Sequence, residues 1–538
     1  MIDKLKSQRF IIENVLRVDF GIPSYILDNY SENALVVLDQ DLRVNPYSCY
    51  DKECGFTITL CNKVAEKIGY TNQTEKCKAY IQFSLDKVAE QGHCYAKEWQ
   101  VNSHLKDQKF TDYCFQNAIS ELQKQRLVFV SPKGNYFSSK YFNAEMRFAN
   151  KLKELSKLNN RHTGFIKSDF SSVYEKLNEI QKSVVDAIES NSLIVFTGLP
   201  GTGKTTTIRA IVDCYGEEDI LLFAPTGKAA ARMSELCSIQ ANTLHSVFSP
   251  LFIDRPVYEN KIIIVDELSM CDVEIAGNLA NGIGNGCVVI LVGDPDQLPS
   301  VGPGQVLKDV LASGVGLRYH LNVVMRTKPG SILQSAHSIH AGKFIVTGED
   351  KEVLTFYPKV WDIAIIVSQI LKHPEWKDAQ FLSVLREKGS TIANTVAQKI
   401  LNPHGLNKFK TGDKVIHTKN NKDLGVFNGE MGIVVNSGFD GITVEFKDKL
   451  ISYPHNLMWQ LDLAYCITIH KSQGSEFDKV VLLLSPSQIT TRNIFYTGLT
   501  RTKSKILIVA PSEEVIVNAI ANKQKSRQTS MSWLLKKE

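Results

Sequence analysis

The chain has 538 residues, 43% of them hydrophobic, and its 62 basic and 57 acidic residues leave a net charge of +5. This length predicts three or four domains, and so mild a charge neither requires nor excludes a nucleic-acid partner. The 11 cysteines are odd in number and contain no Cys-x-x-Cys pair, so the sequence indicates neither a zinc knuckle nor a disulfide framework. It contains no signal peptide and no apolar run near the about 18 residues of a membrane span, so we expect a soluble protein of the reducing cytoplasm.

Residues 1–165 are polar, rich in Lys, Gln and Asn, and patterned as helices without a strong buried strand. We therefore expect a helical N-terminal domain. From about residue 170 to residue 340, apolar runs alternate with helical segments; the runs are 193–196, 220–223, 262–265 and 288–291. This alternation predicts a doubly wound α/β sheet domain, which we assign to 166–318.

The segment Gly198-Leu-Pro-Gly-Thr-Gly-Lys-Thr205 lies between the first of these strands and a helical run. Its glycines let backbone N–H groups surround phosphates, and the following helix N-terminus favours negative charge. Lys204 would reach the β- and γ-phosphates, and the Thr205 hydroxyl would ligate Mg²⁺. The segment therefore predicts a nucleoside triphosphate site, to which we assign Gly198, Gly201, Thr202, Gly203, Lys204, Thr205 and Thr206.

Polar side chains follow two of the predicted strands at the edge where ligands of parallel sheets gather. After strand 262–265, Asp266 would hold Mg²⁺ and Glu267 would deprotonate the attacking water. The alternative, an N-cap for a helix beginning near Ser269, is disfavoured by the neighbouring phosphate loop. Gln297 follows strand 288–292 and would touch the γ-phosphate; the alternative is a loop of good turn formers.

The same alternation recurs near the C-terminus at 381–384, 480–483 and 506–509. It predicts a second sheet domain made of 319–408 and 455–538. Between these parts, residues 409–454 show short alternating segments with turns at Asn428-Gly429 and Asp440-Gly441, which predicts a small inserted antiparallel barrel. Arg326 and Arg501 are candidates for stabilising transition-state charge from this second domain.

Further segments stand in a fixed order along the chain: Leu177–Gln181, Ala224–Arg232, Thr243–His245, Val265–Met270, Gly293–Gly304, Ile467–Glu476 and Tyr496–Arg501. Together with the phosphate loop and Arg326, they resemble the motifs of superfamily 1 helicases. More narrowly, they resemble superfamily 1B helicases of the RecD type, which are exonuclease V alpha-subunit-like, in their short stand-alone form. The resemblance implies two RecA-like parallel-sheet motor domains, a helical N-terminal domain and an inserted SH3-type β-barrel.

The resemblance also implies a function: translocation on single-stranded DNA driven by ATP and Mg²⁺, usually 5′→3′, with strand separation in replication, recombination or repair. Gln181 would read the adenine, Gly474 and Glu476 would border the nucleotide, and Gln297, Arg326 and Arg501 would sense the γ-phosphate. The residues implied to touch DNA are Pro225, Thr226, Thr243, His245, Asn428, His470 and Lys471. Taken singly, such residues are more often helix N-caps, core histidines or solvated lysines.

The resemblance implies single-stranded DNA and duplex–single-strand junctions as partners. A single-strand-binding protein or replication and recombination proteins are further expected partners, and no membrane is expected. The Lys- and Asn-rich composition fits a low-GC bacterium or a bacteriophage, and hence the bacterial cytoplasm. Two alternatives remain open: a partner-dependent translocase subunit of a nuclease or repair complex, and an ATP-gated remodeller that binds RNA.

Two regions have two interpretations each. Gly21-Ile-Pro-Ser24 and the segment 55–69 resemble the openings of helix–hairpin–helix elements, but Glu53-Cys54-Gly55 replaces the usual glycine-rich turn. The N-terminal domain would either bind DNA or act as a helical scaffold. Residues 246–261, with a turn at Asp254-Arg255-Pro256, would form either a strand-separating hairpin or a connecting loop.

Overall fold

The structure is a computed structural model. It describes residues 2–52, 54–168, 171–249, 255–322, 330–343, 352–405, 407–421, 423–447 and 449–536. Contacts divide the chain into an N-terminal unit, made of 1–146, 302–304 and 527–530, and a main unit made of 147–301, 305–526 and 531–538. The predicted boundary at residue 165 is therefore later than the division that the contacts define.

The N-terminal unit is mainly helical, as predicted. Its helices are α1 (Ile2–Phe20), α2 (Ser24–Leu27), α3 (Glu32–Val44), α4 (Ile58–Ile68), α5 (Gln73–Glu90), α6 (Glu98–Leu105), α7 (Asp112–Lys124) and the first part of α8 (Ser139–Ser156). Side chains of Ser31, Thr57 and Thr111 cap α3, α4 and α7 by accepting backbone N–H groups. Gly21 turns the chain between α1 and α2 with a φ of 71°, and Gly69 ends α4 with a φ of 68°.

This region also contains a small antiparallel sheet of order β1-β3-β2, built from β1 (Tyr95–Lys97), β2 (Val128–Val130) and β3 (Asn135–Ser138). None of the three is a fully buried strand. Strands of three or four residues show too few alternations for the period-two pattern to be recognised in a sequence.

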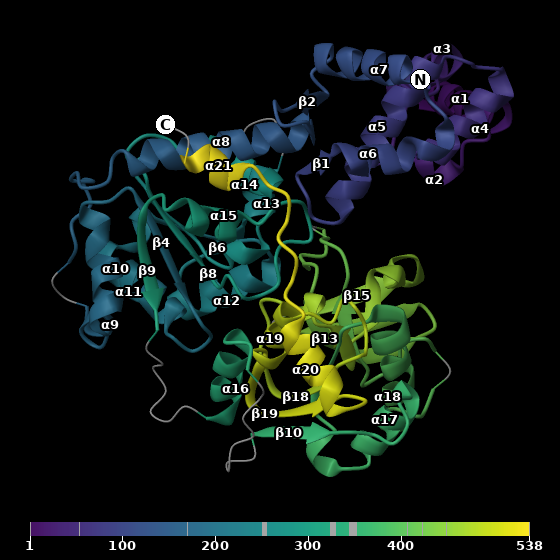
Figure 1. Ribbon diagram of the computed structural model, residues 1–538. Coiled ribbons are helices and arrows are strands. Elements are labelled where there is room, and N and C mark those ends of the chain that lie inside the picture. Colours follow the sequence, from purple (N-terminus) through teal and green to yellow (C-terminus); the bar gives the residue numbers. More distant parts are fainter. Residues whose placement is uncertain are drawn as a thin grey trace. The chain divides into compact units, whose positions relative to one another are not determined.

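The main unit holds a first, six-stranded parallel sheet of order β6-β5-β7-β8-β4-β9 (Figure 1). Its strands are β4 (Leu193–Gly198), β5 (Ile220–Ala224), β6 (Ala241–Thr243), β7 (Ile262–Val265), β8 (Val288–Gly293) and β9 (Leu317–Leu321). Its helices are α9 (Ser172–Glu175), α10 (Glu179–Asp186), α11 (Lys204–Tyr215), α12 (Gly227–Cys237), α13 (Leu244–Phe248), α14 (Val273–Gly282) and α15 (Val306–Ser313). The four predicted strands are confirmed, whereas the edge strands β6 and β9 are additional.

The predicted domain boundary after residue 318 is wrong because it cuts through β9. This strand pairs with β4 along its whole length, from Ile194 opposite Leu317 to Gly198 opposite Leu321. Only the last residue of β9 is buried, as expected of an edge strand, so it lacks the continuous apolar run that marks the central strands.

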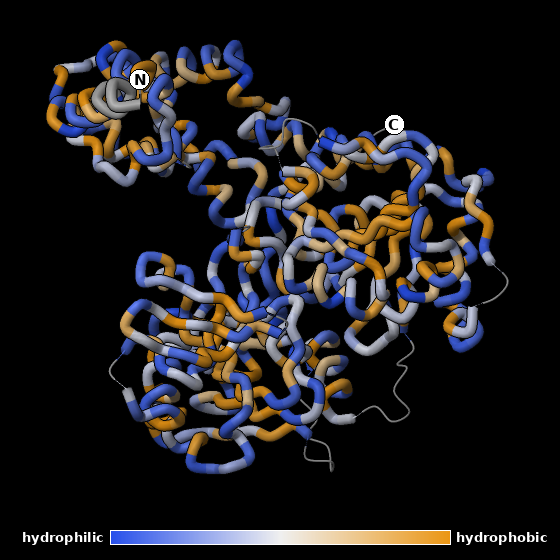
Figure 2. Tube along the Cα trace, turned by 180° about the vertical axis from the view of Figure 1, so that it is seen from behind, coloured by the Kyte–Doolittle hydropathy of each residue, from blue (hydrophilic) through white to orange (hydrophobic). Residues whose placement is uncertain are grey.

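The second parallel sheet has the order β10-β19-β18-β11-β17. Its strands are β10 (Val353–Phe356), β11 (Gln380–Ser383), β17 (Cys466–Thr468), β18 (Phe477–Leu483) and β19 (Thr502–Val509), and its helices are α16 (Ser331–His340), α17 (Ile363–Leu371), α18 (Ile392–Leu401), α19 (Arg492–Leu499) and α20 (Glu513–Ala521). Leu482 and Ile508 pack into one core with α16, α19 and α20, whereas Val481 and Leu507 pack into another with α17. Both faces are thus covered, and Figure 2 shows hydrophobic residues concentrated along the strands. The last helix is α21 (Met531–Lys536).

Between β11 and β17 the chain forms an antiparallel sheet of order β15-β14-β13-β12-β16, which we call the insert. Its strands are β12 (Lys414–His417), β13 (Met431–Gly438), β14 (Gly441–Phe446), β15 (Lys449–Pro454) and β16 (Leu461–Leu463). They enclose one core that contains Phe409, Val434 and Leu461. The predicted end of this element at residue 454 is too early, because β16 pairs with β12 and completes the sheet.

A buried carboxylate fixes the beginning of the insert. Asp413 is fully buried, and its Oδ1 accepts hydrogen bonds from Asn402 Nδ2 at 2.8 Å and from the Tyr465 hydroxyl at 2.9 Å. Its Oδ2 accepts from Gln398 Nε2 at 2.5 Å and from the backbone N–H of Lys410 at 2.7 Å. Four donors thus converge on one buried side chain: they come from α18, from the residue that ends it, from the segment before β12 and from the residue before β17.

Each of the eleven cysteines is a thiol outside any disulfide. Among the residues that the structure describes, no helix is both long and apolar enough to cross a membrane.

We predict that Asp413→Asn weakens the second sheet domain. The amide keeps one oxygen and turns two hydrogens toward existing donors, so about 2–3 kcal/mol of stability is lost. Thermal unfolding followed by circular dichroism should show a transition lower by about 4–12 °C. Asp440→Asn, at an exposed turn of the insert, is the control and should unfold like the wild type. Equal melting of the two variants would contradict the anchoring role.

Candidate nucleotide and DNA site

The loop between β4 and α11 has the geometry of a phosphate-binding loop. Gly201 and Gly203 adopt φ values of 77° and 84°, which side chains disfavour. The Thr202 hydroxyl donates to the Leu199 carbonyl at 2.7 Å and holds the loop from inside. The Lys204 amine donates to the Gly198 carbonyl at 2.6 Å, so it lies over the loop at the start of α11. Backbone N–H groups and a cation are thus gathered at one helix N-terminus.

The acidic pair lies at the carboxyl end of β7, beside the loop. The Asp266 carboxylate accepts the backbone N–H of Glu267 at 2.7 Å, and Glu267 adopts a left-handed φ of 53°. The helix that begins near Ser269 is the short 3₁₀-helix Leu268–Met270, in which Glu267 occupies the N-cap position without a capping bond from its side chain. The next helix, α14, is capped by Asp272, which accepts the Ile275 N–H at 2.9 Å. Burial raises the pKa of both carboxyls, the charge of Asp266 further raises that of Glu267, and Lys204 opposes both shifts.

One cavity of about 300 Å³ joins most of the predicted nucleotide and catalytic residues. Its lining includes Gly201, Gly203, Lys204, Thr205, Thr206, Asp266, Glu267, Gln297, Gly474, Glu476 and Arg501. The first eight belong to the first sheet domain and the last three to the second. The cavity is therefore built by both sheet domains.

Arg501 and Glu476 are fixed in different ways. Arg501 is only 4% exposed, and its guanidinium donates to the carbonyls of Thr497 at 3.2 Å and Ser475 at 3.3 Å. Glu476 accepts from Arg232 of α12 at 2.7 Å, an ion pair between the two sheet domains that the sequence did not reveal. This pair occupies the carboxylate that was predicted to border the nucleotide.

The loop after β8 is tied to α19 by buried hydrogen bonds. Asp294, fully buried, accepts the Tyr496 hydroxyl at 2.8 Å, which together with burial raises the pKa of that tyrosine. The backbone N–H of Leu298 donates to the Thr497 hydroxyl at 3.0 Å, and Asn493 Nδ2 donates to the Asp296 carbonyl at 2.7 Å. We call these three bonds the seam. They hold the loop that carries Gln297 against the helix that precedes Arg501.

Three residues that were predicted to bind the nucleotide do not line the cavity and instead support the phosphate loop from inside. Thr202 bonds to the loop itself, and a Cβ on Gly198 would lie 2.5 Å from the Thr202 hydroxyl. Gln181 is fully buried; its Nε2 donates to the carbonyls of Thr202 at 3.3 Å and Gly203 at 3.4 Å, and its Oε1 accepts the Asn178 N–H at 3.0 Å. Adenine reading by Gln181 stays a prediction, and the observed bonds give it a role in supporting the loop.

The residues present fit Mg²⁺. Thr205 and Asp266 line the same cavity, and hydroxyl and carboxylate oxygens are the ligands that this ion prefers. The buried Oε1 of Gln297 has no hydrogen-bond partner among the described residues and belongs to the same lining. Within the described ranges no group of three or more His, Cys, Asp or Glu could hold a metal.

Two predictions fall outside the described residues. Arg326 lies in the segment 323–329, and the proposed hairpin includes residues 250–254, among them Asp254. Both stay predictions.

The residues of the first sheet domain that were predicted to contact DNA gather at one edge of its sheet, after β5 and β6. Ala224, at the end of β5, pairs with Thr243, at the end of β6, so Thr226 and Thr243 leave neighbouring strands. Each caps the next helix: Thr226 accepts the Ala229 N–H at 3.2 Å, and Thr243 accepts the Ser246 N–H at 3.1 Å. His245 is exposed beside them, whereas Pro225 is buried.

The insert and the second sheet domain bring further predicted residues to this region. A Cβ on Gly227 would lie 2.8 Å from Phe427, so the loop of Asn428 meets the start of α12. Lys471 lies in the short helix His470–Ser472 and donates to Asp462 at 3.1 Å. Together with Thr468 and the unpredicted Arg386, it lines a cavity of about 200 Å³. DNA contact by these residues stays a prediction.

Three family models match the main unit of the chain, and several known helicases match much of the chain. Residues 176–357 match the model of an AAA domain, 393–446 that of the "ATP-dependent RecD-like DNA helicase SH3 domain", and 463–509 that of the "UvrD-like helicase C-terminal domain". The ATP-dependent RecD2 DNA helicase of Deinococcus radiodurans is 29% identical over 66% of this chain, a match that spans 52% of that relative's length. The RecBCD enzyme subunit RecD of Mycolicibacterium smegmatis is 27% identical over 68% of this chain and 76% of its own length. A solved Pif1 helicase, from a study of DNA unwinding at forked duplexes, is 21% identical over 63% of this chain and 94% of its own, with a TM-score of 0.44.

The paired sheets, the phosphate loop and the arginine across the cavity are typical of P-loop nucleoside triphosphatases. The three family models match in chain order, so the main unit is similar to RecD-like helicases of superfamily 1B. The match spans about half the length of the RecD2 relative.

We predict that Gln181→Ala raises KM for ATP and for GTP by a similar factor of about 5–10, because the loop loses hydrogen bonds that do not depend on the base. Steady-state hydrolysis with both nucleotides measures this. Lys182→Ala, on the next residue of α10, is the matched control and should leave both KM values unchanged. A rise for ATP alone would instead indicate that Gln181 reads adenine.

Proposed function

We propose that this chain is a motor that hydrolyses ATP to move 5′→3′ along single-stranded DNA and to separate duplex DNA. The observation that carries the proposal is the cavity shared by the two sheet domains, with Lys204, Asp266 and Glu267 on one side and Arg501 on the other. A nucleotide bound there would touch both domains, so its cleavage would change how they are held together.

In the proposed hydrolysis, Glu267 accepts the proton of the attacking water. Its raised pKa, caused by burial and by Asp266, makes the ionised carboxylate a stronger base than an exposed one. Lys204 and the N–H groups of the loop would hold the β- and γ-phosphates, and Arg501 would stabilise the charge that develops on them. Thr205 and Asp266 would hold Mg²⁺, which when bound neutralises phosphate charge.

Movement would follow from this chemistry through the seam. Asp294, Leu298 and Asp296 bond to α19, so the loop that carries Gln297 is coupled to the helix before Arg501. Loss of the γ-phosphate would release Gln297 and Arg501 together. Alternating grip by the first-domain edge at Thr226 and Thr243 and by the second-domain segment at Lys471 would then move the strand.

The proposal includes the 5′→3′ direction of movement, the choice of DNA over RNA and the cellular process that the motor serves. Unwinding would serve replication, recombination or repair, at duplex–single-strand junctions and with a single-strand-binding protein or other DNA-processing proteins as partners. A partner-dependent role is a second candidate, favoured by the match to a relative named as a subunit of the RecBCD enzyme over 76% of that relative's length.

We expect Glu267→Gln to lower kcat for ATP about 10²–10⁴-fold, because the amide cannot accept the proton. Nucleotide affinity, measured by titration with a fluorescent ATP analogue, should stay within about threefold, since the substitution keeps size and contacts. Glu259→Gln, at an exposed position outside the cavity, serves as the control. A variant that still hydrolyses ATP at the wild-type rate would remove Glu267 from the mechanism.

Polarity can be tested with duplexes that carry either a 5′ or a 3′ single-stranded tail. We expect the wild type to open only the 5′-tailed duplex, with hydrolysis stimulated by single-stranded DNA, and Lys204→Ala to do neither because its loop cannot hold the phosphates. Stimulation without unwinding would favour the partner-dependent subunit. Stronger stimulation by single-stranded RNA than by DNA would refute DNA as the strand.

A further inference from the structure

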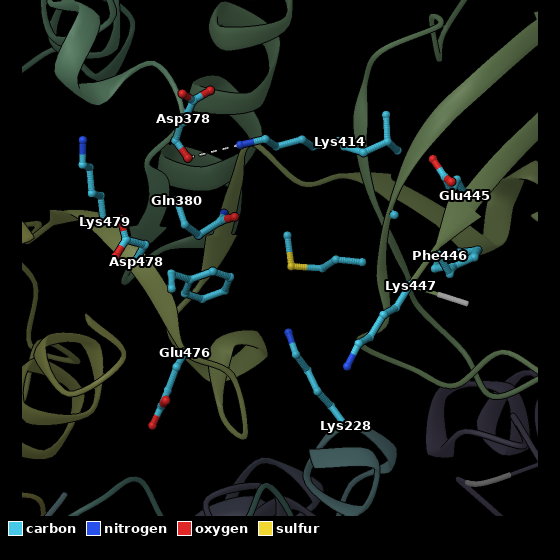
Figure 3. Close-up of a pocket in the computed structure, with 14 residues that line it drawn as sticks. Lys228, Asp378, Gln380, Lys414, Glu445, Phe446, Lys447, Glu476, Asp478 and Lys479 are labelled. Carbon is cyan, nitrogen blue, oxygen red and sulfur yellow. Dashed lines mark hydrogen bonds between the residues drawn. The ribbon is translucent and has the colours of Figure 1, made fainter. Parts of the chain in front are cut away.

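A second cavity, of about 760 Å³, lies where both sheet domains meet the insert (Figure 3). Its lining comes from Lys228 of α12, from the segments around Gln380 and Phe477 at the starts of β11 and β18, and from insert residues around Lys414 and Met431. The cavity adjoins the nucleotide cavity, because Glu476 lines both. None of the roles assigned above uses it.

Lys228 is the most unusual group in this cavity. Its amine lies 5.4 Å from the centre of the Phe477 ring, and it forms no hydrogen bond or ion pair with any residue in the described part of the chain. Burial and the charge of Arg501 lower its pKa to about 8, and Glu430 only partly compensates. A cation withdrawn from water and repelled by a like charge is unfavourable unless an anion joins it.

Three further lysines line the same cavity: Lys414, Lys447 and Lys479. Lys414 donates to the backbone carbonyl of Asp378 at 3.4 Å, and burial lowers its pKa. Lys447 pairs with Glu235 at 2.7 Å, but both side chains are more than half exposed, and such pairs are weak. Figure 3 shows Lys228 and Lys447 reaching toward the middle of the cavity.

Four carboxylates line the cavity together with the lysines: those of Asp378, Glu445, Glu476 and Asp478. Figure 3 shows the carboxylates of Asp378 and Glu476 pointing away from its middle, and Glu476 is already paired with Arg232 at 2.7 Å. The middle of the cavity therefore holds the Lys228 amine beside an apolar wall that includes Met431 and Phe446. Phosphate groups are the anions that suit lysine clusters, and apolar walls accommodate sugars and bases.

We propose that this cavity is a second phosphate-binding site, in which Lys228, assisted by Lys414 and Lys447, binds a phosphate group of a nucleic-acid strand or free inorganic phosphate. The inference rests on the proposed function, in which the chain binds a nucleic-acid strand and releases phosphate beside this cavity. The two sources share one chemistry, and separate experiments distinguish them.

Binding of a nucleic-acid strand to this cavity is tested by the salt dependence of DNA affinity. Anisotropy titrations of a fluorescent oligo-dT without nucleotide give the slope of log K against log salt. Lys228→Gln should reduce the magnitude of this slope by about 0.7 and weaken binding at low salt about 2–5-fold. Lys228→Arg should retain the wild-type slope. Lys479→Gln is the matched control, because Lys479 lines the same cavity but donates to the Glu375 carbonyl at 3.3 Å.

Free phosphate is tested by calorimetric titration of inorganic phosphate into Lys204→Ala protein, whose nucleotide loop lacks its phosphate-binding amine. Binding heat that disappears in the Lys204→Ala/Lys228→Gln double variant would assign the site to free phosphate. Lys447→Gln gives an independent check in both experiments and should cause a smaller loss in the same direction.

An unchanged salt slope together with unchanged phosphate binding in the Lys228→Gln protein would overturn the proposal. The proposed function is judged separately. If DNA-stimulated hydrolysis persists in Lys228→Gln and is lost in Lys204→Ala, the proposed motor function is supported. This holds even when the salt slope and the phosphate titration refute the second phosphate-binding site. A wild-type protein without DNA stimulation would refute the motor, and the phosphate titration would still decide the site.

Discussion

The buried hydrogen bond between Asp294 and Tyr496, at 2.8 Å, is the contact on which the arrangement of the predicted catalytic residues depends. A buried carboxyl group needs hydrogen-bond partners, and Asp294 finds them both in its own loop, at the Asp296 N–H, and on α19, at Tyr496. Gln297 lies three residues after Asp294, and Arg501 follows α19 closely in the sequence. Gln297 and Arg501, which line one cavity from opposite domains, are therefore held by one short network.

Helix α12 connects the nucleotide cavity with the insert. Its first residue, Gly227, packs against Phe427 of the insert, while Arg232, less than two turns later, pairs with Glu476 at the nucleotide cavity. Because a helix is rigid over this length, α12 links these two contacts without any intermediate element.

The parts of this fold that could be predicted are those encoded by adjacent residues. Central strands such as 262–265 are continuous apolar runs, and the phosphate loop combines glycines and a lysine within eight positions. Edge strand β9 and the three-residue strands escaped detection because they are half-exposed or too short for a period to show. The seam could not be predicted either, since Asp294 and Tyr496 are 202 residues apart and each is an ordinary polar residue in its own segment. The same holds for Gln181. Its place beside the phosphate loop can be predicted from the sequence, but the direction of its side-chain amide depends on tertiary contacts.

The chain enters and leaves the insert on paired strands. Val415 of β12 lies opposite Leu463 of β16, so the two connections to the second sheet domain are neighbours in space. A module attached through adjacent ends can be exchanged or resized without stretching its host, because closing the gap costs little chain entropy. The insert is thus a module joined to the second sheet domain at one point, and its contacts with α12 restrict what could replace it.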